Sequence, residues 1–286
     1  MQVVLLSGVS GSGKSVALKA LEDNGYYCVD NLPVQLFAET VKLLRAAGNE
    51  KVAISIDVRG GKAVAQLPDH LEALKYNGVD ARLIFLDSKT ETLIKRYAES
   101  RRRHPLAVGQ VTLQEAIAHE RDLLSPVAEV GHRIDTSDLQ PNALRAWIKE
   151  LLKAGEGQTS LLFESFGYKQ GIPLDADFVF DVRCIPNPYY DPKLRPLCGT
   201  DAEVIRFLEN EPSAVKMLAD IRAFIEAWLP SFRKDNRAYL TVAIGCTGGQ
   251  HRSVYLAERL AAHFRAPPHG QAPVLVRHRQ LGVPVA

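Results

Sequence analysis

A glycine- and serine-rich segment near the start of the chain carries the clearest chemistry. It matches G-x-x-x-x-G-K-[ST] at every fixed position, follows the apolar run Val3–Leu6 and precedes a helix-forming stretch, Val16–Leu21. In that context glycines let backbone N–H groups point at phosphate oxygens, Lys14 reaches the β- and γ-phosphates, and Ser15 ligates Mg²⁺. The alternative is a plain turn before a helix. The predicted nucleotide-binding residues are Gly8, Val9, Ser10, Gly11, Ser12, Gly13, Lys14 and Ser15.

Three aspartates follow predicted strands, and their carboxylates suit a metal ion or an attacking water. Asp87 ends the apolar run Leu83–Leu86, Asp57 follows Val52–Ile56, and Asp30 follows a further strand. The carboxyl ends of parallel strands face one crevice, which is where ligands bind in such sheets. We predict that Asp87 joins Ser15 at a Mg²⁺ ion. Each aspartate alone is equally well explained as a residue that caps a turn.

A second glycine loop occurs late in the chain, between the apolar run Tyr239–Ile244 and a helical stretch. It reads Gly-Cys-Thr-Gly-Gly-Gln-His-Arg-Ser from residue 245 to 253, and it predicts an anion site at a helix N-terminus. Arg252 adds a forked donor for phosphate. The spacing from Cys246 to Arg252 also matches cysteine phosphatases, in which a thiolate attacks the phosphate. Phosphate binding, phosphatase chemistry and a structural turn therefore remain open.

Two basic segments suggest further anion contacts. Arg101-Arg102-Arg103-His104 ends a predicted helix from about Glu91, where it either complements the helix C-terminus or forms a lid over the phosphates. No acidic residue follows Glu258, and the end of the chain contains glycine and proline. We expect a flexible basic tail that contacts RNA, although a merely solvated tail has the same composition. The predicted RNA-binding residues are Arg265, Arg277, His278 and Arg279.

Composition sets limits on the class of protein. The chain has 286 residues, 46% of them hydrophobic, with 24% charged and a net charge of +2, as in soluble globular proteins. Its four cysteines form no C-x-x-C pair, which argues against a zinc site or a disulfide framework. We find neither a signal-peptide pattern nor an apolar run of roughly 20 residues. We expect a cytoplasmic protein without a membrane partner.

The elements that must position these residues alternate between strand and helix. This order predicts an α/β fold with parallel sheets and helices on both faces. We expect a P-loop domain over residues 1–153, a linker over 154–160 and a second α/β domain over 161–286, which contains the second loop and the basic tail.

Several longer strings give the chain a resemblance to a known family. It resembles the RapZ/YvcJ-like family of P-loop nucleotide-binding proteins over nearly its whole length. The strings that carry the resemblance are Gly8–Ser15, Tyr27–Pro33, Ser55–Arg59, Phe163–Gly167, Phe180–Arg183, Pro186–Pro188, Asp191–Arg195 and Gly245–Ser253.

The resemblance implies a kinase-like P-loop domain that binds ATP and a second domain similar to a phosphofructokinase subdomain. It implies weak nucleotide hydrolysis at most, and self-assembly into dimers or tetramers. It also implies an adapter that presents a small regulatory RNA to an endoribonuclease, controls glucosamine-6-phosphate synthesis and senses an amino-sugar phosphate. The implied GTP contacts are Asp57, Val58, Arg59 and Gly60. The implied sugar-phosphate contacts are Thr247, Gly248, Gly249, His251, Arg252 and Ser253.

This chain departs from the RNA-binding adapters at its end, because no lysine follows Lys234. Arginine replaces lysine there, and arginine both binds phosphate and stacks on bases. A small-molecule kinase or NTPase with a phosphosugar-binding second domain is the alternative interpretation.

Overall fold

A computed structural model describes residues 1–100, 102–107, 109–153, 159–234, 239–267 and 273–281. The chain divides into two compact units at Leu152 and Lys153. Most of the expected linker, residues 154–158, lies outside the described residues. Ser160, at the end of that expected linker, already belongs to a strand.

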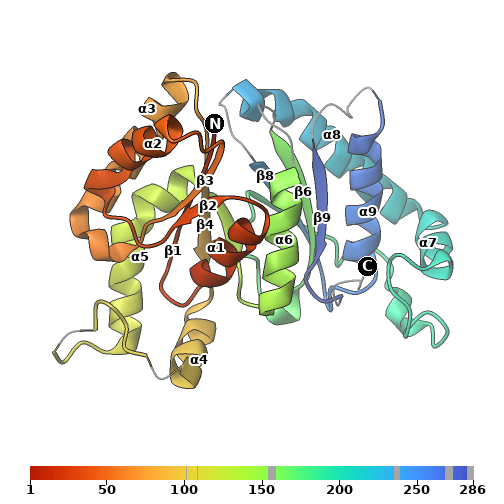
Figure 1. The fold of residues 1–286 in the computed structure, drawn as a ribbon. Helices are drawn as coiled ribbons and strands as arrows, with labels where there is room; N and C mark the ends of the chain where they lie inside the picture. Colours follow the sequence, from red (N-terminus) through yellow and green to blue (C-terminus); the bar gives the residue numbers. More distant parts are fainter. Residues whose placement is uncertain (101, 108, 154–158, 235–238, 268–272, 282–286) are drawn as a thin grey trace. The chain divides into compact units, whose positions relative to one another are not determined.

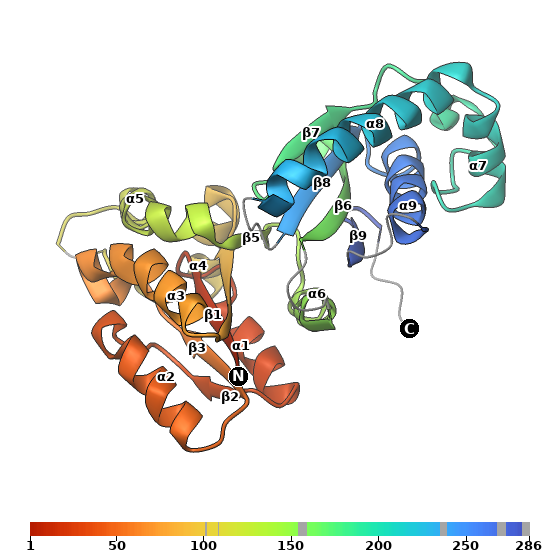
Figure 2. The ribbon, with the colours of Figure 1, turned by 90° about the horizontal axis from the view of Figure 1, so that it is seen from above.

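The first unit contains a five-stranded parallel sheet in the order β2-β3-β1-β4-β5. Helices α2, α3 and α5 lie on one side of the sheet, and α1 and α6 lie on the other (Figures 1 and 2). The strands are β1 (Gln2–Gly8), β2 (Tyr27–Val29), β3 (Lys51–Ser55), β4 (Asp80–Asp87) and β5 (His132–Asp135). The helices are α1 (Lys14–Asp23), α2 (Phe37–Ala46), α3 (Leu67–Tyr76), α4 (Thr90–Ser100), α5 (Leu113–Val130) and α6 (Pro141–Lys153).

The central strand β1 is apolar throughout because both of its faces are covered. Val3 and Leu5 join the core beneath α2, α3 and α5, while Val4 and Leu6 are buried on the opposite face. Strand β1 pairs with β3 on one side and with β4 on the other. The loop after β1 therefore opens between the carboxyl ends of two neighbouring strands, which is the ligand position of such sheets.

The second unit contains a four-stranded parallel sheet in the order β7-β8-β6-β9. Its strands are β6 (Ser160–Gly167), β7 (Phe178–Asp181), β8 (Tyr239–Cys246) and β9 (Val274–His278). Its helices are α7 (Ala202–Glu209), α8 (Pro212–Lys234) and α9 (Arg252–Arg265). A separate core lies between this sheet and helices α8 and α9. The predicted α/β class with parallel sheets is confirmed in both units.

Candidate phosphate-binding sites

The predicted P-loop connects β1 directly to α1, which begins at Lys14. Gly8, Gly11 and Gly13 have φ values of 144°, 88° and 106°, a region that side chains disfavour. A Cβ at Gly8 would also lie 2.2 Å from the Leu86 carbonyl oxygen. The motif therefore requires its glycines for backbone shape, and the loop has the strand–loop–helix setting that phosphate binding needs.

Lys14 is the cation of this loop, and its surroundings are acidic. Its Nζ donates a hydrogen bond to the Gly8 carbonyl at 2.5 Å. Burial of the ammonium group lowers the pKa of Lys14, while the nearby charges of Glu120, Asp57 and Asp30 act to raise it. The ends of β2 and β3 thus place carboxylates around the P-loop lysine.

The segment Asp57–Gly60, which the resemblance assigns to GTP, begins beside this lysine. Asp57 Oδ1 accepts a hydrogen bond from the Arg59 amide at 2.9 Å. The Asn31 amide, oriented to satisfy both of its contacts, donates to Asp57 Oδ1 at 3.0 Å and accepts from Arg59 Nη1 at 3.2 Å. Asn31 has a positive φ of 53°, an unusual backbone state that asparagine tolerates. Val58 is 1% exposed, so its side chain belongs to the core rather than to a ligand surface.

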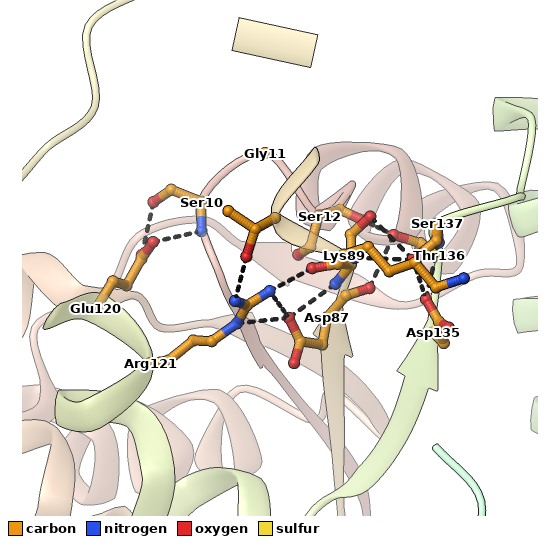
Figure 3. A network of polar contacts seen from close by, with 12 residues as sticks. Ser10, Gly11, Ser12, Asp87, Lys89, Glu120, Arg121, Asp135, Thr136 and Ser137 are labelled. Atoms are coloured by element: carbon orange, nitrogen blue, oxygen red, sulfur yellow. Dashed lines mark hydrogen bonds and ion pairs between the residues drawn. The ribbon is translucent and has the colours of Figure 1, made fainter. Parts of the chain in front are cut away.

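Asp87, the predicted Mg²⁺ ligand, is held in a different network. It is buried, and its Oδ1 accepts from the Ser88 amide at 2.7 Å and from Arg121 Nη2 at 3.3 Å (Figure 3). Asp87 therefore forms an ion pair with Arg121 of α5 through Oδ1.

Magnesium needs few protein ligands when nucleotide phosphates supply the others. Among the described residues, no group of three or more His, Cys, Asp or Glu side chains could hold a metal. Ser15 is exposed in the first turn of α1, so its hydroxyl fits a Mg²⁺ ion that arrives with phosphates.

The arginine-rich segment after α4, predicted to end a helix and to form a lid, differs from this prediction in where the helix ends. Helix α4 ends at Ser100 rather than near Arg103, and Arg101 lies outside the described residues. Arg102 and Arg103 are exposed, whereas His104 turns inward and is buried. Among the described residues of this segment, His104 is the one that reaches the P-loop region, through Glu120.

The second glycine loop connects β8 to α9, which begins at Arg252. Thr247 and Gly248 are exposed, while Gly249 has a φ of 73°. Arg252 and His251 are buried. The exposed part of this predicted anion site is consequently the pair Thr247 and Gly248, in front of the helix N-terminus.

Buried side chains of this loop bind the neighbouring loop that follows β7. Arg252 Nη1 donates to the carbonyls of Arg183 and Ile185 at 2.8 and 2.9 Å, and its Nη2 donates to Thr247 Oγ1 at 3.2 Å. His251 Nε2 bonds the Leu194 carbonyl at 3.1 Å. Burial lowers the pKa of His251, which keeps the ring neutral near pH 7.

Cys246 lies beneath the second loop and is 3% exposed. Burial opposes ionisation of its thiol, but hydrogen bonds from Ser253 and Gly249 and the charge of Arg252 outweigh this effect and lower the pKa. The Gly249 amide donates to Sγ at 3.2 Å. A nucleophile must reach its substrate, and the Arg252 guanidinium already binds backbone carbonyls. The geometry therefore does not favour the phosphatase interpretation.

Comparison with known proteins decides the family. The model of the RapZ-like N-terminal domain matches residues 1–156, and that of the RapZ C-terminal domain matches residues 159–282. The chain belongs to the RapZ family.

Two relatives of the RapZ-family chain illustrate the similarity. A protein of Thiobacillus denitrificans named as a nucleotide-binding protein is 58% identical over 281 residues, covering 98% of this chain and 100% of its own. One of Aromatoleum aromaticum with the same description is 59% identical over 281 residues, covering 98% and 94%. Among solved structures, a shikimate kinase from Bacteroides thetaiotaomicron has a TM-score of 0.38 and 18% identity over 53% of this chain and 98% of that chain.

The end of this RapZ-family chain differs from the expected flexible tail. Val274–His278 forms β9, which pairs in parallel with β6. Arg277 Nη1 lies 3.2 Å from Glu164 and 3.4 Å from Asp175. The expectation of a solvated basic segment is wrong for β9, because two buried acids compensate its arginine.

The other predicted RNA contacts are distributed unevenly. The Arg279 side chain is 1% exposed and lies 3.7 Å from Glu164. His278 bonds Ser165 Oγ through Nδ1 at 2.8 Å and Glu258 Oε1 through Nε2 at 3.0 Å. Arg265 remains exposed at the end of α9. Of the four predicted RNA contacts, Arg265 is the exposed one.

Sequence reasoning missed the residues that surround the P-loop from α4 and α5. Arg96 Nη1 donates to the Gly11 carbonyl at 3.1 Å. Glu120 bonds Ser10, and the adjacent Arg121 bonds Asp87. A signal existed for Glu120, because it shares the apolar face of α5 with Ile117 and Leu124. A carboxylate on such a face requires a polar partner.

No helix within the described residues combines the length and the apolar composition that crossing a bilayer requires.

Proposed function

We propose that this RapZ-family chain is a nucleotide-binding regulatory adapter that presents a small RNA to an endoribonuclease. In this proposal it senses an amino-sugar phosphate and thereby controls glucosamine-6-phosphate synthesis. The observation that carries the proposal is the second glycine loop, which is bonded to a loop with two exposed tyrosines and an exposed arginine. Assembly into a homo-oligomer and a cytoplasmic location belong to the same proposal.

ATP is the proposed ligand of the P-loop, with Mg²⁺ held at Ser15. GTP is the second proposed nucleotide. Because Asp57 and Arg59 act on the charge of Lys14, their segment borders the P-loop. We therefore propose that ATP and GTP are alternatives in one crevice, in which Lys14 supplies the positive charge.

The proposed amino-sugar phosphate site is the second glycine loop. Thr247 and Gly248 are exposed, and the start of α9 adds the positive end of its dipole. Arg252 contributes by holding Thr247 and by adding positive charge behind the loop.

The proposed RNA contact replaces the expected tail with the stacking surface, which we define as Tyr189, Tyr190 and Arg195. The two tyrosines are 50% and 79% exposed, and the Arg195 guanidinium lies 4.8 Å from the Tyr189 ring centroid. Single-stranded RNA is recognised by aromatic rings and arginine planes that stack on unpaired bases. This surface supports RNA binding better than the buried arginines of β9.

Contacts hold the stacking surface to the second glycine loop. Gln250 Nε2 donates to the carbonyls of Arg195 and Leu197 at 3.3 and 2.6 Å. The His251 contact with the Leu194 carbonyl adds a third bond between these loops. A ligand that moves the glycine loop therefore also moves the backbone that carries the stacking residues.

The test combines RNA recovery with a matched pair of tyrosine variants. RNA crosslinked to the full chain in cells is sequenced, and the dominant species is used in binding measurements. Tyr190→Ala should weaken binding about 5-fold to 150-fold, because one stacked base contributes about 1–3 kcal/mol. Tyr76→Ala is the control, since Tyr76 is 92% exposed on α3 in the first unit. Recovery of no dominant RNA, or equal affinities of both variants, would contradict the proposed function.

A small-molecule kinase is the second candidate function. The observation that favours it is the acidic surroundings of Lys14, because Asp30 or Asp57 has the chemistry of a base for an acceptor hydroxyl. Stoichiometric ADP formation that depends on an added amino sugar would favour the kinase over the adapter.

A further inference from the structure

A carboxylate of the chain itself accepts hydrogen bonds from polar groups of the P-loop. Glu120 Oε2 accepts a hydrogen bond from the Ser10 backbone N–H at 2.9 Å, and Oε1 accepts from Ser10 Oγ at 2.7 Å. Figure 3 shows the α5 side chain reaching the loop from the side opposite Thr136. The two residues are 110 positions apart, so the fold places this anion on the loop.

Glu120 is held in this position by a histidine from the segment between α4 and α5. His104 Nε2 lies 2.9 Å from Glu120 Oε2, and both side chains are 0% exposed. His104 Nδ1 accepts a hydrogen bond from the Leu106 amide at 3.1 Å. The neutral ring therefore carries its proton on Nε2 and donates to the carboxylate. Glu120 thus receives three hydrogen bonds, two from Ser10 and one from His104.

The backbone N–H groups of a P-loop serve to bind phosphate oxygens. A carboxylate and a phosphate are both anions, and their repulsion is strong where water is excluded. A phosphate that approaches Ser10 must therefore displace Glu120 or bind against its charge.

We propose that Glu120 is an internal competitor of nucleotide phosphates at Ser10, and that His104 holds it in the competing position. This inference rests on the proposed binding of ATP at the P-loop. The competition penalises ATP more than ADP because ATP brings one more phosphate group, so Glu120 limits the preference of the site for triphosphates. The α4–α5 segment senses the nucleotide through the contact between His104 and Glu120.

The first test compares Glu120→Gln with Glu129→Gln in the full chain by calorimetry. Glutamine keeps the shape and an acceptor for the Ser10 amide but removes the charge. Glu129 lies on the same helix and is exposed, so its variant controls for charge alone. Glu120→Gln should bind Mg²⁺-ATP about tenfold more tightly than wild type, with a smaller gain for ADP. Unchanged or weaker ATP binding in a folded Glu120→Gln protein would overturn the proposal.

The second test needs no variant of the buried carboxylate. The ¹⁵N resonance of His104 Nε2 is followed in the wild-type chain as Mg²⁺-ATP is added. Loss of the Glu120 hydrogen bond should shift this resonance, whereas a purely structural pair would leave it in place. An unshifted resonance at saturating ATP refutes the competition even where Glu120→Gln does not fold.

The two proposals fail in different ways. Absence of ATP binding by the wild-type chain removes the proposed function and, with it, the competition at Ser10. Normal ATP binding by wild type together with an unchanged ATP/ADP ratio in Glu120→Gln removes the competition alone.

Discussion

At the scale of single residues, the buried ammonium group of the P-loop lysine is partly compensated by nearby carboxylates. Lys14 loses hydration in its position, and the carboxylates of Glu120, Asp57 and Asp30 compensate part of that cost. A cation that has lost hydration by burial is well suited to a ligand that brings several negative charges. The phosphate then replaces contacts within the loop rather than water.

Lys14→Ala should weaken ATP binding by about 100-fold or more, because a charge-assisted phosphate contact is lost. Lys19→Ala is the control, since Lys19 is exposed on the same helix.

The affinity of the wild-type chain for ATP should also fall as the pH becomes alkaline. A lowered pKa means that free Lys14 loses its proton below its ordinary value of 10.5, and the neutral amine attracts phosphate poorly. Calorimetry over a pH series measures both effects, and equal ATP affinity of the two variants would contradict the assignment.

The sequence predicts the P-loop because its information is local: eight consecutive residues fix the loop, the lysine and the hydroxyl. The partners of that loop were not predictable in the same way. Glu120 and Ser10 meet only after α5 packs on the sheet. The predicted metal ligand Asp87 also pairs with Arg121 of α5, a contact that strand patterns do not reveal.

At the scale of elements, β9 shows how charge patterns mislead. A run containing Arg277 and Arg279 reads as solvated when only its neighbours in sequence are considered. In the fold these arginines meet Glu164 and Asp175, which come from the start of the second unit. The alternation of strand and helix is predictable from periodicity, but the ion pairs of β9 join residues about a hundred positions apart, which periodicity does not reveal.

Arg277→Ala should destabilise the second unit by about 3–5 kcal/mol, because it leaves Glu164 buried without this partner. Arg222→Ala on α8 is the control, since Arg222 is exposed and such changes usually stay within about 0.5 kcal/mol. Urea unfolding followed by circular dichroism measures the difference. Equal midpoints for the two variants would mean that the β9 ion pairs contribute little.

At the scale of the whole molecule, charge is nearly balanced, with 35 lysines and arginines against 33 aspartates and glutamates. Such a chain has little long-range attraction for RNA. Any RNA contact must then depend on a local group such as the stacking surface.

Arg195→Ala should reduce the slope of log affinity against log salt by about 1, because one phosphate-directed cation is lost. Fluorescence anisotropy with the crosslinked RNA at several salt concentrations gives the slope. A slope equal to that of wild type would assign Arg195 to stacking rather than to phosphate.

The bonds from Gln250 and His251 to the loop of the stacking surface have a thermodynamic consequence. If an amino-sugar phosphate at Thr247 changes RNA affinity by some factor, linkage requires RNA to change the sugar-phosphate affinity by the same factor. The adapter would then not be a one-way sensor. Abundant RNA would itself change the sugar-phosphate concentration at which the protein responds. The bound RNA would then adjust the threshold of the response that regulates it.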